Sequence, residues 1–167
     1  MIKKLAQYFI FSVIIASGLF YLYVKNSGAN SGEIAPDFET TLVDGTPFKL
    51  SDLRGKYVLL DFWGSWCAPC IKESPKLVSI HEKYQDQVII VTIALEKNDK
   101  TWEKATDKLG YIWKHQIVDQ NKFVLMSSIA RKYGVTEIPA KFLITPEGKL
   151  LGKYSFEKID TVLSSKD

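Results

Sequence analysis

Cysteine and histidine are scarce, because this chain of 167 residues contains only two of each. A structural zinc site needs four ligands at short spacings, and His81 and His115 lie far apart along the chain. We therefore expect no metal site. Neither histidine is placed to act as a base for a cysteine, so we interpret both as surface or capped side chains.

The chain also lacks a compact run of basic residues and any internal repeat. Its net charge is +3, and its 22 Lys and Arg residues are interspersed with 19 acidic ones. Nothing in this pattern favours nucleic-acid binding, so we expect no nucleic-acid partner. The length suits one domain with an appendage.

Both cysteines stand in one short segment, Trp66-Cys67-Ala68-Pro69-Cys70. Cysteines at positions i and i+3 of a helix can close a disulfide within the permitted Cα separation. A structural disulfide gains stability with the length of its loop, and a two-residue loop gains little. Thiols that make and break one bond form a two-electron couple, so we interpret Cys67 and Cys70 as a redox pair without a cofactor.

The residues around the pair predict a strand, a turn and a helix. An almost unbroken apolar run from Tyr57 to Trp63 is typical of a buried strand, and Pro69 to Tyr84 predicts a helix kinked at Pro75. Cys67 would lie at the helix N-terminus, where unpaired N–H groups and the helix dipole lower the pKa of a thiol. We expect Cys67 to attack the substrate disulfide. Cys70 should be less exposed and should resolve the mixed disulfide that forms.

Two carboxylates accompany the pair. Asp61 lies inside the apolar strand, where a charge is costly unless it is paired or neutral, and Glu73 shares a helix face with Cys70. Either carboxylate, with its pKa raised by burial, is a candidate base for the Cys70 thiol. The alternatives are an Asp61 hydrogen-bonded to the backbone at a strand end and a solvated Glu73.

Further patterns predict the remaining elements. Asp44-Gly45 predicts the turn of a hairpin over 38–50. The expected strands cover 57–63, 88–95, 115–119, 141–145 and 149–154, and the expected helices cover 69–84, 100–109, 124–133 and 156–163. Lys141 and Arg131 are candidates to frame a substrate groove, but we expect both on a solvated face.

Two segments resemble the thioredoxin superfamily. Leu60 to Cys70 looks like its active-site strand and loop, and Val135 to Ile144 looks like its cis-proline segment. In that family the backbone at the cis-proline pairs with an incoming peptide. The resemblance implies a nucleophilic Cys67, a resolving Cys70, a proton-handling Asp61, and a substrate surface made by Trp66, Pro69, Ile138 and a cis Pro139.

In finer detail the chain is similar to the membrane-anchored TlpA/ResA-like branch. The likeness covers about residues 34 to 163 and is carried by 35–38, 50–56 and 62–64. Glu73 falls where that branch carries a buried active-site Glu. The branch usually has Asn in place of Asp61 and Thr in place of Ala140, so which carboxylate acts as the base stays open.

The fold class implied is α/β, a thioredoxin fold with a central mixed β-sheet flanked by helices. An N-terminal β-hairpin extends it, and a helix-strand insertion precedes the cis-Pro segment.

The N-terminus is apolar. Leu5 to Val24 carries no formal charge, and 20 helical residues span roughly 30 Å, about a bilayer core. The alternative is a cleaved signal peptide with a poor site at Ser27 to Ala29. No cysteine lies near that site, which excludes lipoprotein processing. We divide the chain into an anchor or signal segment (1–25), a flexible linker (26–33) and a thioredoxin-like domain (34–167).

These features predict an extracytoplasmic thiol-disulfide oxidoreductase of the bacterial cell envelope, held at the membrane by its N-terminal helix. Carboxylates near the pair disfavour an over-stable thiolate, which favours reduction over oxidation. The resemblance implies disulfide-containing exported proteins as substrates, for example apocytochrome c, and a membrane thiol electron donor. A thiol oxidase or isomerase and a non-redox peptide-binding domain are the alternatives. A peroxiredoxin-type peroxidase is disfavoured, because such proteins place a Thr and a Pro ahead of the reactive cysteine.

Overall fold

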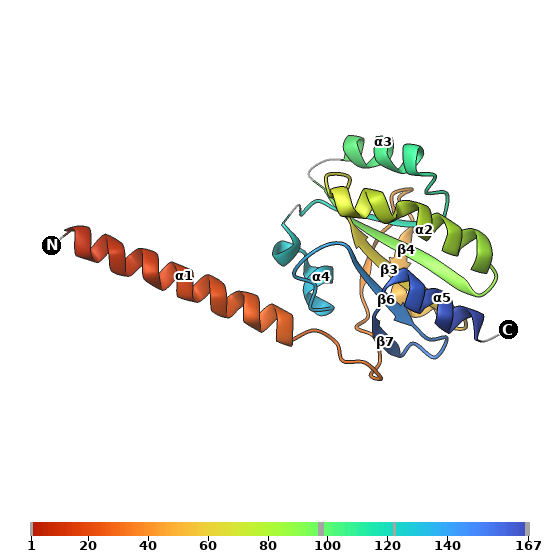
Figure 1. Cartoon of the computed structure of the whole chain (residues 1–167), viewed down its shortest axis with the longest axis horizontal. Coiled ribbons are helices and arrows are strands. Elements are labelled where there is room, and N and C mark those ends of the chain that lie inside the picture. The colour runs from red at the N-terminus through yellow and green to blue at the C-terminus, as the bar shows by residue number, and fades with distance from the viewer. Residues whose placement is uncertain (1, 97–98, 122, 166–167) are drawn as a thin grey trace.

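The computed structural model describes residues 2–96, 99–121 and 123–165. A long helix, α1 (Ile2–Asn26), projects from a domain built on a five-stranded sheet (Figure 1). The strands are β1 (Glu39–Thr41), β2 (Pro47–Lys49), β3 (Tyr57–Trp63), β4 (Val88–Leu95), β5 (His115–Asp119), β6 (Ala140–Ile144) and β7 (Leu150–Lys153). The helices are α2 (Ala68–Tyr84), α3 (Asp99–Leu109), α4 (Ser128–Lys132) and α5 (Phe156–Ser164), with 3₁₀ turns η1 (Leu50–Leu53) and η2 (Val124–Met126).

The large sheet is mixed, with the strand order β5-β4-β3-β6-β7. β3 and β5 lie parallel to β4, whereas β6 is antiparallel to both β3 and β7. β1 and β2 form a separate antiparallel hairpin, and α3 with β5 forms the inserted unit before the cis-proline segment. The predicted thioredoxin fold with a central mixed sheet is therefore confirmed.

Alternation along β3 decides which side chains reach the cysteines. Leu60 and Phe62 enter the core cluster that includes residues of the hairpin and α4, whereas Leu59 and Trp63 enter the cluster that includes α2 and α5. Asp61 has the same parity as Leu59 and Trp63. It therefore points to the α2 side of the sheet, where the disulfide lies.

The helix predicted over 124–133 is interrupted. η2 ends at Met126, and the hydroxyl of Ser127 accepts a hydrogen bond from the N–H of Ala130 at 3.0 Å. A serine in this position is an N-cap, so it starts a new helix instead of continuing the old one. The other predicted helices and strands are present and differ from the prediction mainly at their ends.

α1 is long and apolar enough to cross a membrane over Lys3–Asn26, and its apolar window is not buried inside the molecule. The segment after it, predicted as a linker, is hydrogen-bonded to the domain. The N–H of Ala29 donates to the carbonyl of Lys132 (3.3 Å), and the N–H of Gly32 donates to the carbonyl of Leu150 (2.7 Å). The segment thus runs beside α4 and β7.

Candidate active site

The two cysteines form a disulfide at the N-terminus of α2, with their Cα atoms 5.2 Å apart. Cys67 is the N-cap of the helix, and its Sγ accepts a hydrogen bond from the N–H of Cys70 at 3.3 Å. The two residues are 5 % and 4 % exposed in this oxidised state, so exposure does not separate them as predicted. The N-cap position separates them instead, because helix N–H groups stabilise a thiolate on Cys67.

The turn before the disulfide is fixed to the end of β4. The N–H and the hydroxyl of Ser65 both donate to the carboxylate of Glu96, and the indole N–H of Trp66 donates to the carbonyl of Leu95 at 2.7 Å. A Cβ on Gly64 would lie 2.8 Å from Trp66 Nε1, so the close approach requires glycine. Trp66 remains 44 % exposed despite these contacts.

The cis-proline segment meets the disulfide just before β6. The Ile138–Pro139 peptide bond is cis. The carbonyl oxygen of Ile138 lies 3.9 Å from Cys67 Sγ, and Pro139 lines a cavity together with Cys70. The arrangement matches what the resemblance implies, while contact of these residues with a substrate stays a prediction.

A small cavity borders Cys70 and is lined by both predicted carboxylates. Its lining is Asp61, Cys70, Glu73, Ser74, Leu77, Tyr111, Pro139 and Phe156. Asp61 is 4 % exposed, and burial raises its pKa to about 7. The Lys141 ammonium opposes this rise and the Glu73 carboxylate adds to it. A carboxyl with such a pKa is matched to proton exchange near neutral pH.

Lys141 lies on a buried face, so its predicted solvation is wrong. Its side chain is 6 % exposed, its Nζ pairs with Glu73 Oε2 at 2.5 Å, and it lies 4.6 Å from the centre of the Phe156 ring. The reason is the position of β6 inside the sheet, where every residue of the strand is buried. Glu73 is 38 % exposed, which is neither the solvated nor the fully buried state considered from the sequence.

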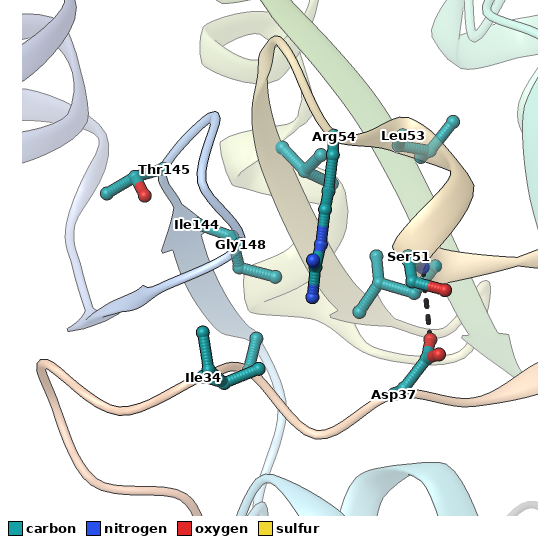
Figure 2. A pocket seen from close by; sticks show the side chains of 11 residues that line it. Ile34, Asp37, Ser51, Leu53, Arg54, Ile144, Thr145 and Gly148 are labelled. Carbon is teal, nitrogen blue, oxygen red and sulfur yellow. Dashed lines mark hydrogen bonds between the residues drawn. The ribbon is translucent and has the colours of Figure 1, made fainter.

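A second pocket lies at the opposite end of β3 (Figure 2). Its lining includes Val58, Ile144, Asp37, Ser51 and Arg54, and no cysteine. The carboxylate of Asp37 accepts a hydrogen bond from the N–H of Ser51 at 3.0 Å. Because β3 carries Val58 near its start and leads to the disulfide turn at its end, this pocket is separate from the redox site.

Sequence reasoning identified the disulfide, both carboxylates and the cis-proline, but it missed Glu96 and misplaced Lys141. Glu96 carried a usable signal, because it directly follows the buried strand β4 at the edge where the strand beside it also ends. Arg131, the other groove candidate, donates to the carbonyls of Leu125 and Met126 and so braces η2. In the part of the chain that the structure describes, no three His, Cys, Asp or Glu side chains are grouped to hold a metal ion.

Comparison with known proteins agrees with this geometry. The model of the AhpC/TSA family matches residues 31–152. The chain is similar to the thiol-disulfide oxidoreductase ResA of Bacillus thuringiensis (strain Al Hakam), at 31 % identity over 137 residues, covering 79 % of this chain and 76 % of the relative. It is also 31 % identical to ResA of Bacillus subtilis (strain 168), covering 78 % and 70 %.

A solved thiol-disulfide oxidoreductase from Bacteroides fragilis NCTC 9343 has the same fold. It superposes with a TM-score of 0.73 at 27 % identity, covering 81 % of this chain and 100 % of that structure. The family match spans the disulfide, its carboxylates and the cis-proline. The chain therefore belongs to the AhpC/TSA family and is a thiol-disulfide oxidoreductase of the TlpA/ResA-like branch.

Proposed function

We propose that this oxidoreductase works as a reductase of disulfides in exported proteins. The observation that supports the direction is the cavity in which Asp61 and Glu73 border Cys70. Negative charge beside a dithiol makes its thiolate less stable, and a less stable thiolate means a more reducing couple. Lys141 offsets part of this charge through its ion pair with Glu73, and the buried Asp61 adds negative charge as the pH rises through its pKa of about 7.

The proposed reaction has two exchange steps. The Cys67 thiolate attacks a substrate disulfide, forms a mixed disulfide and releases the first substrate thiolate. Cys70 then gives its proton to Asp61, attacks Cys67 Sγ and releases the second substrate thiolate. The substrate gains two electrons, and the Cys67–Cys70 pair loses two and becomes the disulfide seen in the structure.

We assign proton acceptance to Asp61 in preference to Glu73. Asp61 has a pKa of about 7, so near neutral pH it is present in both the accepting and the donating form. Glu73 Oε2 is already engaged by the ammonium of Lys141. Protonation of Glu73 would leave that buried cation without its partner, which is costly.

The substrate surface proposed here is small and close to Cys67. Trp66 and Pro69 are exposed on the helix side, and Ile138 with Pro139 forms the strand side. An extended peptide could pair with backbone beside the cis-proline, as strand addition does elsewhere. Such backbone contacts accept many sequences, which suits an enzyme that reduces several exported proteins.

We place the domain outside the cytoplasm and keep the division into an anchor or signal segment (1–25), a linker (26–33) and a catalytic domain (34–167). α1 has the length and composition of a membrane span. An oxidising compartment is where disulfide-bonded substrates form. The enzyme would then need a membrane thiol electron donor to restore its dithiol after each turnover.

The test of direction is the reduction potential of the Cys67–Cys70 couple, measured on the full-length protein in detergent by equilibration with dithiothreitol or glutathione. A value near or below about −250 mV would support the reductase. A value near about −120 mV would overturn it and favour the thiol oxidase or isomerase.

The substrate class is tested with Cys70→Ser, which leaves the mixed disulfide on Cys67 unresolved. Exported proteins with cysteine pairs, such as apocytochrome c, should be trapped in cells, and a Cys67→Ser, Cys70→Ser double variant should trap none. Trapping of cytoplasmic proteins alone would contradict the location. Full function of Cys67→Ser in cells would instead favour a non-redox peptide-binding domain.

A further inference from the structure

A buried lysine of β6, Lys141, contacts two residues that line the redox cavity, Glu73 and Phe156. Lysine is almost never fully buried unless it is paired, and the side chain of Lys141 is 6 % exposed. Its aliphatic stem ends in an ammonium over the Phe156 ring of α5, which is a cation–π contact. The buried ammonium of Lys141 is thus stabilised by two specific partners, Glu73 and the ring of Phe156.

The register of the sheet places Lys141 directly beside Asp61. The two residues are opposite one another on the antiparallel strands β6 and β3. Opposite residues of paired strands project to the same face of a sheet. Lys141 and Asp61 therefore share the α2 side, which is also the side of Cys70.

The same ammonium is bound by a carboxylate of α2. Lys141 Nζ donates to Glu73 Oε2 at 2.5 Å, across a separation of 68 positions in the chain. Glu73 lines the cavity that Asp61 and Cys70 also line. Lys141 is thus paired with Glu73 and lies opposite Asp61 in the sheet, and both carboxylates line the cavity beside the resolving cysteine.

We propose that Lys141 is a positioning residue that holds Glu73 in an ion pair and sets the charge beside Asp61, the acceptor of the Cys70 proton. This rests on the proposed role of Asp61 as the proton acceptor. While Glu73 is paired, proton transfer to it would break a charge-assisted hydrogen bond and leave a buried ammonium alone. Transfer to Asp61 breaks no such bond.

The titratable groups around Asp61 come from three packed segments. Lys141 comes from β6, Glu73 and Cys70 come from α2, and Tyr111 comes from the segment after α3. Tyr111 is uncharged at neutral pH, since the ordinary pKa of a phenol is about 10 and burial raises it further. Lys141 and Glu73 are therefore the charged neighbours that act on Asp61, and they act with opposite signs.

The experiment isolates the resolving step. Reduced full-length protein is mixed with one equivalent of 5,5′-dithiobis(2-nitrobenzoate). Attack by Cys67 releases one thionitrobenzoate, and intramolecular attack by Cys70 releases the second. The rate of the second release is followed against pH, and its midpoint reports the group that accepts the proton of Cys70.

Two variants should move that midpoint in opposite directions. Lys141→Met removes the cation, so the midpoint should rise. A rise of about one unit, typical for the loss of an opposite charge, would slow the second release at pH 7 by about fivefold. Glu73→Gln removes the negative neighbour but keeps an oxygen that can accept from Lys141, so the midpoint should fall. Lys141→Arg keeps the charge and should leave the midpoint close to that of the unmodified protein.

If Lys141 only stabilises the fold, its replacement should not change the midpoint. The matched control is Lys83→Met, which removes an exposed lysine of α2 from its surface pair with Asp160 and should leave the midpoint unchanged. If Lys141→Met and Glu73→Gln both leave the midpoint in place, or both move it in the same direction, the proposal is wrong. Where Lys141→Met does not fold, Lys141→Gln, which also removes the charge but keeps a polar end, decides in its place.

Asp61→Asn separates this inference from the proposed function. Loss of the midpoint in Asp61→Asn supports Asp61 as the acceptor, whatever Lys141 does. If Asp61→Asn keeps the midpoint, the acceptor assignment fails and the role of Lys141 fails with it. If only Asp61→Asn changes the profile, the acceptor stands and Lys141 is structural.

Discussion

The N–H and the hydroxyl of Ser65 both donate to the carboxylate of Glu96, so the turn before the redox disulfide is tied to the end of the neighbouring strand. Glu96 is 1 % exposed and also accepts from the hydroxyl of Thr101 at 3.3 Å. A carboxylate with several donors is satisfied only in one arrangement of the chain around it. Glu96 thereby holds the turn that presents Trp66 and the disulfide.

Replacing Glu96 should loosen this turn. In Glu96→Ala the Ser65 donors lose their partner, and we expect a loss of about 1–3 kcal/mol in the free energy of unfolding. The first release of thionitrobenzoate should also slow, because Cys67 is less well placed. Denaturant unfolding and the release assay measure the two effects.

The control is Glu39→Gln, which alters an exposed pair with Lys49 and should change the free energy of unfolding by less than about 0.5 kcal/mol. If Glu96→Ala unfolded at the same denaturant concentration as the unmodified protein, this role of Glu96 would be contradicted.

Gly64 should not tolerate a side chain. A Cβ there would lie 2.8 Å from Trp66 Nε1 and 3.2 Å from the carbonyl oxygen of Leu95. Gly64→Ala should therefore break the indole hydrogen bond and cost about 1–3 kcal/mol of stability, as overpacking commonly does. Tryptophan fluorescence and denaturant unfolding would show it. Gly18→Ala is the control, since a Cβ there meets nothing within 4 Å. Equal stability of the two variants would contradict the packing argument.

The elements and residues predicted correctly depend on local signals. β3 follows from its apolar run, α2 from the apolar face of residues 69–84, and the disulfide from the spacing of Cys67 and Cys70. The cis bond before Pro139 came from a resemblance carried by a short segment. Each signal is contained within a few neighbouring residues, so sequence patterns are enough to read it.

The misplaced Lys141 and the missed Glu96 depend on contacts between distant segments. Lys141 pairs with a residue 68 positions away, and Glu96 binds a turn 31 positions away. Whether a lysine in an apolar strand faces water or a carboxylate is decided by which helix packs on that face. Local patterns do not carry that information, so the ion pair that we place at the centre of proton transfer was not predictable from β6 alone.

The contact between Gly28 and Gly134 should control how the linker lies on the domain. A Cβ on Gly28 would meet Gly134 Cα at 2.6 Å. Gly28→Val should therefore displace 26–33 from α4 and increase its cleavage in limited proteolysis. The release assay should stay unchanged, because the disulfide is not touched. Asn30→Ala alters an exposed side chain of the same segment and serves as the control. Equal cleavage of both variants would mean that the segment is already free in solution.

The stability of the oxidised protein should depend on pH through Asp61. Burial raises the pKa of this carboxyl from 3.8 to about 7. Between these values the folded state holds a proton that the unfolded state has lost, so the free energy of unfolding falls as the pH rises through this window. Below about pH 4 both states are protonated, and above about pH 7 neither is. The full penalty is on the order of 4 kcal/mol.

Asp61→Asn removes the titrating group, so its free energy of unfolding should increase relative to that of the unmodified protein as the pH rises. The two proteins should be closest in stability near about pH 4, and the variant should be more stable by a few kcal/mol at about pH 8, measured by denaturant unfolding with the disulfide intact. Asp160→Asn is the control and should keep a nearly constant difference from the unmodified protein between these two pH values, because hydrogen bonds from Lys83 and Tyr84 lower the pKa of Asp160 and so place its titration below about pH 4. If the advantage of Asp61→Asn were the same at both pH values, Asp61 would not change its protonation on folding. The same carboxyl could then not serve as a proton acceptor near neutral pH, and Glu73 would take that role.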